Sequence, residues 1–276
     1  MGDSKIVGSD LPEGFNYPPY RNDKIFEEYA CDYFSNEPRY ISAYWTRIIN
    51  TWDNNRINEY CNRLNQIVPI EGAFTVCTHD DAPIKIWGDK VKYFSAGGKV
   101  KGTISIPLIA PNFPYKPKEK DIFAHFSGSL THPCRNELLE LTGERRVVIT
   151  IKEWSPKVTH LEEKCNFDLM ARSVFAFCPR GYGTTSFRLY EALHLKCIPI
   201  YISDEHWLPF QNKIDWERIC ILCSSAKEGH NMALRLEHKR AMDMVKYAQS
   251  VKHELTDFDA VCENIRQIAN GHNYNK

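Results

Sequence analysis

The chain has 276 residues, of which 43% are hydrophobic and 25% charged, a composition typical of a folded globular protein with one large or two modest domains. Its 35 basic and 35 acidic residues cancel, so nucleic-acid binding has no electrostatic support. No apolar run approaches the roughly 20 residues of a membrane span and the first residues contain no signal-peptide core, so we expect a cytoplasmic protein with no membrane partner.

In the first half, residues 1–20 are rich in glycine, proline and aspartate and predict an extended arm. Apolar spacing then predicts three helices, over residues 25–34, 41–50 and 57–68, and three short strands, over residues 73–77, 91–94 and 103–107.

The strand over residues 73–77 is followed by His79, Asp80 and Asp81. A histidine and two acids at the carboxyl end of a strand suit a general base. The alternative is that one acid caps a turn before Pro83. Because adjacent side chains point in different directions, we expect at most one acid to face a cleft, and we predict Asp80 or Asp81 as the base with His79 behind them.

A proline- and lysine-rich stretch, residues 112–120, predicts a linker between two domains. Beyond it we predict strands over 122–127, 147–151, 173–178 and 197–202, helices over 136–141 and 166–172 and after residue 186, and two or more helices over 226–270. Alternating strands and helices on both sides of the linker indicate two α/β halves with a cleft between them.

Most of the ten cysteines lie in apolar runs, where a thiol behaves as a small buried hydrophobe. Examples are Cys77, Cys178 and Cys197. Cys220 and Cys223 form a lone CxxC without a second pair downstream, so a zinc or redox role lacks partners. We therefore predict reduced, structural thiols.

The stretch over residues 173–210 predicts a parallel βαβ unit. Gly181 ends the strand predicted over residues 173–178. Residues 183–186, GTTS, then supply the turn and the helix N-cap. Such a loop lies at the carboxyl edge of the sheet, where open α/β folds bind ligands. The free amides of a helix N-terminus favour an anion such as a phosphate.

Three charged side chains accompany this loop. Arg180 and Arg188 suit a diphosphate, and Glu191, one turn further along the helix, suits a ribose diol. The alternative is a surface ion pair between Arg188 and Glu191 with a solvated Arg180. A second strand–glycine–helix junction, over residues 127–135, also contains an arginine and strengthens the phosphate-binding interpretation.

The residues around both junctions resemble the exostosin-type glycosyltransferases, glycosyltransferase family 47. The likeness is carried by FCPRG from Phe177, TSFRLYEAL from Thr185 and CIPIYIS from Cys197, and it spans roughly residues 20 to 220. The resemblance implies an α/β fold of GT-B type, with two Rossmann-like domains facing each other across a cleft. We assign 1–115 to the acceptor-side domain, 116–250 to the nucleotide-sugar domain, and 251–276 to a helical segment that could pack back on the first domain.

The resemblance also implies inverting transfer without a catalytic metal or other cofactor, and the adjacent Asp80 and Asp81 do not form a DxD motif. By position, Arg135 and Arg180 match family arginines near the donor diphosphate, Arg188 matches another motif arginine, and Glu191 the acid that holds the ribose. The full predicted donor-binding set is Ser127, Gly128, Arg135, Arg180, Gly181, Tyr182, Thr184, Thr185, Ser186, Arg188 and Glu191.

Animal and plant members usually have an N-terminal anchor and a stem, and we expect neither here, so the sequence resembles short soluble forms such as those encoded by large algal viruses. We predict transfer of a sugar, with xylose the first choice, from a UDP-sugar to a glycan acceptor. Two alternatives stay open: a catalytically silent nucleotide-sugar or glycan-binding subunit, and another phosphate-binding enzyme such as a phosphosugar isomerase. Aromatic residues that could stack on sugars, or pack in the core, are Tyr93, Phe94, Tyr182, His206 and Trp207.

Overall fold

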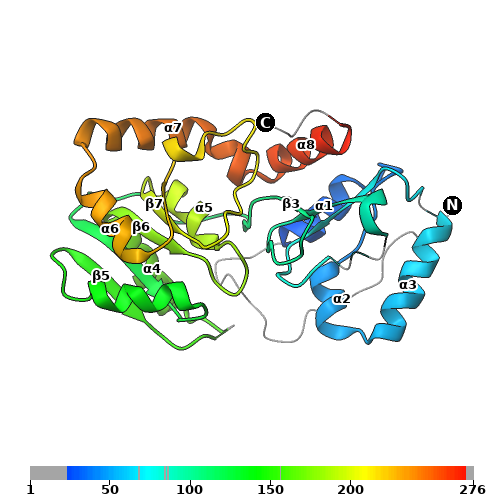
Figure 1. Cartoon of the computed structure of the whole chain (residues 1–276), viewed down its shortest axis with the longest axis horizontal. Helices are drawn as coiled ribbons and strands as arrows, with labels where there is room; N and C mark the ends of the chain where they lie inside the picture. The colour runs from blue at the N-terminus through cyan, green and yellow to red at the C-terminus, as the bar shows by residue number, and fades with distance from the viewer. Residues whose placement is uncertain (1–23, 68, 84, 86, 156, 272–276) are drawn as a thin grey trace.

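The computed structural model describes residues 24–67, 69–83, 85, 87–155 and 157–271, so the predicted arm over residues 1–20 lies outside it. Figure 1 shows two α/β halves side by side, the N-terminal one in blue and cyan and the C-terminal one in green to orange. The protein thus has the predicted α/β fold of GT-B type, with two Rossmann-like halves that face each other.

The N-terminal half is a three-stranded parallel sheet, in the order β1-β2-β3, with helices packed around it. Its elements are α1 (Phe26–Tyr33), α2 (Trp45–Thr51), α3 (Asn54–Ile67), β1 (Ala73–Cys77), the 3-10 helix η1 (Gly88–Lys90), β2 (Val91–Ser95) and β3 (Ile104–Ser105). All five residues of β1 are buried, as expected for a parallel strand covered on both faces.

Two helix starts in this half differ clearly from the prediction. Helix α3, expected from residue 57, begins at Asn54. We expected a helix from residue 41, but α2 begins at Trp45. Residues 40 and 41 instead run beside β1, where the Ile41 N–H donates to the Phe74 carbonyl at 2.8 Å. The apolar residues that suggested an early helix start are buried as extended chain.

The C-terminal half is a five-stranded parallel sheet in the order β5-β4-β6-β7-β8. Its strands are β4 (Ile122–Gly128), β5 (Val147–Ile151), β6 (Ser173–Pro179), β7 (Ile198–Ile202) and β8 (Ile221–Cys223). The chain passes from β4 outward to β5 and then returns to the other side of β4 as β6. Such a reversal is the topological switch point at which doubly wound sheets bind ligands.

Helices cover this sheet on both faces. They are the 3-10 helix η2 (Pro133–Leu141), α4 (His160–Ala171), α5 (Phe187–His194), the 3-10 helix η3 (Trp216–Arg218) and α6 (Ala226–Leu234). The predicted helix at 136–141 is therefore a 3-10 helix. The predicted helix at 166–172 is longer, because Thr159 and Glu162 form a capping box that starts α4 upstream.

Two final helices, α7 (His238–Thr256) and α8 (Phe258–Ala269), connect the halves, as Figure 1 shows at the top. Helix α7 packs on α5 and β7, whereas α8 packs on α1. The Tyr29 hydroxyl donates to Asp259 at 2.6 Å, and the Lys92 amine donates to the Ile268 carbonyl at 2.9 Å. The largest core cluster contains side chains of both halves, so this connection is apolar as well as polar. Within the described residues, no helix combines the length and apolar character needed to cross a bilayer.

Candidate functional site

A pocket of about 470 Å³ lies between the two halves, at the carboxyl ends of β1, β4 and β6. Its N-terminal wall includes Ile25, Phe26, Thr46, Asn50, Thr78, His79, Asp80, Asp81 and Leu108–Ala110. Its C-terminal wall includes Ser127–Ser129, Arg135, Lys152–Ser155, Asn166, Gly181–Gly183, Thr185–Arg188 and Glu191. The pocket thus brings together the strand end that carries the predicted base and the two junctions that carry the predicted anion site.

The loop between β6 and α5 forms the centre of the C-terminal wall. The Ser186 hydroxyl accepts a hydrogen bond from the Arg188 N–H at 3.3 Å and so caps α5. Helix α5 therefore begins with its positive dipole end facing the pocket, next to the Ser186 side chain. The sequence pattern predicted this N-cap correctly.

Arg188 extends from the first turn of α5 to the end of β4. It donates to the Ser127 carbonyl and lies 4.6 Å above the Phe126 ring. Its Nε atom is buried and has no hydrogen-bond partner in the protein. Since a buried N–H without a partner is costly, this atom is a donor that a bound anion can satisfy.

Arg135 connects the two strand-end loops of this wall. Its guanidinium donates to the Arg180 and Ser129 carbonyls, each at 2.8 Å, and to the Pro179 carbonyl at 3.3 Å. The side chain is buried and lines the pocket. These contacts fix a positive charge between the carboxyl ends of β4 and β6.

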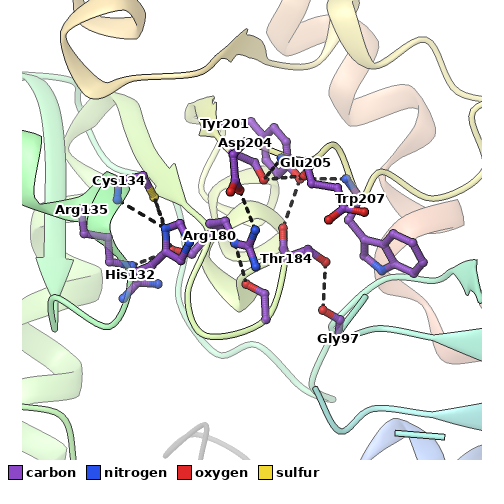
Figure 2. A network of polar contacts seen from close by, with 12 residues as sticks. Gly97, His132, Cys134, Arg135, Arg180, Thr184, Tyr201, Asp204, Glu205 and Trp207 are labelled. Carbon is purple, nitrogen blue, oxygen red and sulfur yellow. Dashed lines mark hydrogen bonds and ion pairs between the residues drawn. The ribbon is translucent and has the colours of Figure 1, made fainter. Parts of the chain in front are cut away.

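Arg180 and Thr184, which belong to the predicted donor-binding set, are not among the described lining residues of the pocket. Figure 2 shows Arg180 beside Asp204, and its Nη1 forms an ion pair with the Asp204 carboxylate at 2.6 Å. Its Nε donates to the Gly183 carbonyl. Arg180 therefore holds the loop between β6 and α5 through the Gly183 carbonyl, and its charge also lowers the pKa of Asp80.

Thr184 attaches the same loop to the N-terminal half. Its N–H and its hydroxyl both donate to the Gly97 carbonyl, each at 2.9 Å. Figure 2 shows the contact between Thr184 and Gly97. The Trp207 indole adds a hydrogen bond to the Ser95 carbonyl at 3.1 Å. The loop between β6 and α5 is thus held in place by the N-terminal half as well as by its own sheet.

Asp80 lies on the N-terminal wall, close to the loop between β6 and α5. A side chain on Gly183 would place its Cβ 2.0 Å from the Asp80 Oδ1 atom, so only glycine fits there. Burial raises the pKa of Asp80 to about 6, and the neighbouring Asp81 carboxylate adds to the rise, while Lys99, Arg180 and the Gly183 N–H oppose it.

Asp81 also lines the pocket, so the expectation that at most one of the two acids faces the cleft is wrong, but its contacts differ from those of Asp80. Lys99 donates to its Oδ1 at 2.8 Å, and the Tyr182 hydroxyl donates to both of its oxygens at 3.1 Å. Burial alone would raise the pKa of Asp81, but these hydrogen bonds outweigh burial and leave the pKa below its usual value. A paired, easily ionised carboxylate is a weak base.

His79 lines the pocket but has its Nδ1 occupied. This atom accepts a hydrogen bond from the Asp81 N–H at 3.1 Å. Burial lowers the pKa of His79, so the ring is neutral and carries its proton on Nε2. In this tautomer Nε2 can donate a hydrogen bond but cannot take up a proton.

The structure also adds pocket residues that the sequence did not single out. Lys152 and Trp154 follow the end of β5, so the rule used for β4 and β6 could have found them. Thr46 and Asn50 come from α2 and reach the pocket through tertiary packing, for which the sequence has no local signal.

The five aromatic candidates divide between the two predicted alternatives, sugar contact and core packing. Tyr93 and Phe94 are fully buried in the core, and His206 and Trp207 do not line the pocket. Of the five candidates, Tyr182 alone is among the pocket's described lining residues.

No group of three histidine, cysteine, aspartate or glutamate side chains that could hold a metal ion occurs within the described ranges. The named cysteines Cys77, Cys178, Cys197 and Cys220 are buried, as predicted.

Comparison with known proteins bears on this site. A protein-family model described as Exostosin GT47 domain matches residues 88–234. A probable glycosyltransferase of Arabidopsis thaliana is 32% identical over 139 residues, which are 50% of this chain and 25% of that protein. The Exostosin-1 homolog of Caenorhabditis elegans is 25% identical over 201 residues, which are 60% of this chain and 50% of that protein. A probable glucuronosyltransferase of Oryza sativa subsp. japonica is 30% identical over 151 residues, which are 50% of this chain and 33% of that protein.

The chain therefore spans between a quarter and a half of the length of these three relatives. Among solved structures, an α1,3-fucosyltransferase with GDP is similar at a TM-score of 0.41 and 15% identity, covering 81% of this chain and 89% of that chain. TarM of S. aureus is similar at a TM-score of 0.43 and 10% identity, covering 76% of this chain and 58% of that chain.

Proposed function

The chain belongs to the exostosin GT47 family, whose model covers more than half of it, and from that premise we propose that it is a glycosyltransferase that moves a sugar from a UDP-sugar to a hydroxyl group of a glycan. One observation carries the proposal. A carboxyl group with a raised pKa faces two arginines across a single pocket at the switch point of a doubly wound sheet.

The donor diphosphate is proposed to bind between Arg135 and Arg188. Two guanidiniums and the N-terminus of α5 converge there, and the unpartnered Nε of Arg188 offers a further donor. Glu191, one turn further along α5, is proposed to accept hydrogen bonds from the ribose hydroxyls. Gly128 and Gly181 allow the backbone to approach the phosphates closely, because neither carries a side chain.

The proposed reaction is an inverting displacement. Asp80 takes the proton of the acceptor hydroxyl, whose oxygen attacks the anomeric carbon as the bond to UDP breaks on the opposite side. Of the three predicted candidates, Asp80 fits best, because Asp81 is paired with Lys99 and the neutral His79 presents an N–H. Negative charge develops on the departing diphosphate, and the fixed charges of Arg135 and Arg188 stabilise it. The proposed reaction needs no metal or other cofactor.

A neutral pentose, with xylose first, is the proposed donor sugar. In support, the lining residues described for the N-terminal wall include no lysine or arginine, so a sugar carboxylate near Asp80 would lack a partner there. Glucuronate is a second candidate, favoured by the lining residue Lys152 and by the rice relative that is named a probable glucuronosyltransferase. Lys152→Ala is expected to reduce use of UDP-glucuronate far more than use of UDP-xylose if glucuronate is the true donor.

The first experiment measures UDP binding by calorimetry and hydrolysis of UDP-xylose, UDP-glucuronate, UDP-glucose and UDP-galactose. A glycosyltransferase is expected to bind UDP and to hydrolyse one donor slowly in the absence of an acceptor. Arg188→Ala should weaken both, whereas Lys239→Ala, on the surface of α7, should leave both unchanged.

The two alternatives predict other results. A silent binding subunit would bind UDP or a UDP-sugar without hydrolysis or transfer under any condition. A phosphosugar enzyme would bind inorganic phosphate or a sugar phosphate as tightly as UDP. No binding of any uridine nucleotide would contradict the proposed function itself.

A further inference from the structure

Glu27 is a fully buried carboxyl group on α1, behind the N-terminal wall of the pocket. We infer that Glu27 orders the hydroxyls of Thr46 and Thr78 into a subsite that accepts a hydrogen bond from a hydroxyl of the acceptor sugar. This inference rests on the proposed glycosyltransferase function and extends it to the recognition of the acceptor. Glu27 does not line the pocket, so it acts as a positioning residue through the two threonines, which do.

The contacts of Glu27 connect three separate segments. The Thr46 N–H, at the start of α2, donates to Oε1 at 2.8 Å. The Thr78 N–H, just after β1, donates to Oε2 at 2.9 Å. The Thr46 hydroxyl also donates to Oε2, at 3.2 Å, and lies 3.2 Å from the Thr78 hydroxyl. One carboxylate therefore fixes both the backbone and the side chain at this corner of the pocket.

The direction of each hydrogen bond follows from the number of protons. An ionised carboxylate can only accept, so the single proton of the Thr46 hydroxyl points to Glu27. In the contact between the two threonines, Thr46 can then only accept, and the single proton of Thr78 points to Thr46. The Thr78 oxygen keeps a lone pair and has no proton left for the pocket. Toward a ligand it is an acceptor.

This polarity has a consequence for the acceptor. A sugar hydroxyl can donate to Thr78, whereas a carboxylate, an ether oxygen or a fluorine cannot. Thr78 lies two residues before Asp80 on the same strand end, and both line the pocket. The subsite thus suits a neutral sugar that presents two hydroxyls, one for the proposed base and one for Thr78.

Burial raises the pKa of Glu27 to about 7, while the hydrogen bonds from Thr78 and Thr46 oppose the rise. Acceptor kinetics are therefore measured at about pH 8.5, where a carboxyl with the pKa of Glu27 is ionised.

The test pairs a change in the acceptor with a change in the protein. Methyl xyloside, galactoside, fucoside and rhamnoside are screened as acceptors with the donor that wild-type protein hydrolyses. For the best acceptor, each hydroxyl that does not receive the sugar is then replaced by fluorine, which cannot donate a hydrogen bond. We expect one of these fluorinated acceptors to lower kcat/KM of the wild type about tenfold, the effect of one hydrogen bond. Thr78→Val should lower kcat/KM for the parent acceptor about tenfold and abolish the discrimination, because the acceptor atom on Thr78 is gone.

Further variants separate recognition from folding. Thr78→Ser keeps the hydroxyl and should restore the discrimination. Glu27→Gln presents an amide N–H2 in place of one acceptor oxygen, which disturbs the order of protons, and should raise KM for the acceptor with little change in KM for the donor. Glu28→Gln, the matched control, alters the neighbouring carboxylate, which faces Arg47 and does not line the pocket, and should change neither KM.

The possible failures are distinct. If wild-type protein neither binds UDP nor hydrolyses a UDP-sugar, the proposed function fails. If it hydrolyses the donor but Thr78→Val discriminates against every fluorinated acceptor as the wild type does, the subsite is wrong. Donor hydrolysis without transfer to any of the methyl glycosides would equally overturn a sugar-hydroxyl subsite at Thr78.

Discussion

The two walls of the pocket begin from the same structural element, the carboxyl end of a parallel strand, but they present opposite chemistry. The end of β1 carries Thr78, His79 and the acids Asp80 and Asp81, whereas the ends of β4 and β6 lie beside Arg135 and Arg188. The strand end therefore supplies only a location. The charge of the side chains that follow it decides which proposed role the wall suits, proton uptake or anion binding.

The walls also differ in how their charged groups are held. The arginines donate to backbone carbonyls of their own half, so their positions depend on the fold of one sheet. Asp80 instead packs against Gly183 of the opposite half, so its environment exists only when the halves are together. We conclude that anion binding should tolerate changes at the interface better than proton transfer does.

The largest predicted effect comes from Asp80→Asn, which removes the proposed base and keeps the shape of the side chain. General-base catalysis is worth about 10²- to 10⁴-fold, so kcat should fall by about 10³-fold while UDP affinity stays within a factor of about three. Since Asp80 must be ionised to accept a proton and its pKa is raised to about 6, kcat/KM of the wild type should rise with pH through about 6. The rise near pH 6 should be absent in the variant, whereas a rise near pH 7 from the ionisation of Glu27 should remain. Kinetics from pH 4.5 to 8.5 test this, with pH values chosen to bracket the pKa of Asp80.

Asp81→Asn is the matched control for that experiment. Asp81 is paired with Lys99, and the pKa of its carboxyl is low, so it should contribute little to proton transfer. A loss in Asp81→Asn as large as that in Asp80→Asn would reverse the assignment of the base.

The second largest predicted loss of kcat comes from a residue of the C-terminal wall. Arg188→Ala removes one fixed charge from the developing diphosphate anion, and kcat should fall by about 10²- to 10³-fold, or about 3–4 kcal/mol of transition-state stabilisation. Arg180→Ala should cost at least tenfold less in kcat, because Arg180 does not line the pocket and is paired with Asp204. Thermal unfolding of both variants serves as the control. An equal loss at Arg180 without any change in thermal stability would mean that Arg180 contacts the donor after all.

How far these residues could be predicted from the sequence depended on the range of their contacts. The strands at β1, β4 and β6 were predictable because each is a short apolar run, and the Ser186 cap was predictable because capping is local. The capping box of Thr159 and Glu162 is also local and marks the start of α4 in the sequence.

Contacts between distant segments were not predictable in this way. The predicted βαβ unit does place the ends of β6 and β7 side by side, but it does not encode which side chains meet there, such as Arg180 and Asp204. Glu27 and Thr78 are separated by 51 positions and meet through the packing of α1 on β1. Sequence spacing therefore identified the strand ends that form the pocket but not which arginine turns toward it.

A third prediction concerns the free energy of unfolding of Asp80→Asn. Because the folded pKa of Asp80 is raised, folded protein keeps a proton between about pH 4 and pH 6 that unfolded protein has lost, so wild-type stability falls as pH rises through this window. Asparagine cannot ionise and avoids this loss. The variant should be more stable than the wild type by about 3 kcal/mol at pH 8 and by almost nothing at pH 3.5, since one pKa unit corresponds to about 1.4 kcal/mol.

Urea denaturation at both pH values measures the difference. Equal stability of the two proteins at pH 8 would show that the Asp80 carboxylate is not desolvated by the opposite half. It would then behave like the paired Asp81, and the distinction between the two acids would fail.

The smallest predicted effect on stability and kcat comes from the exposed contact of Tyr182 with Asp81 and Lys99, which joins the two walls. The Tyr182 hydroxyl donates to Asp81, and the Lys99 amine lies 3.3 Å above the Tyr182 ring, yet Tyr182 is 56% exposed. Exposed polar and charged contacts contribute about 0–1 kcal/mol, so Tyr182→Phe should change the free energy of unfolding by less than about 1 kcal/mol and kcat by less than about threefold. Thr184→Val, which removes the buried hydroxyl contact to the Gly97 carbonyl, is the comparison and should have the larger effect on kcat. If Tyr182→Phe instead lowered kcat tenfold with unchanged UDP affinity, the exposed cluster would hold Asp80 in place, and the buried backbone contacts would be secondary.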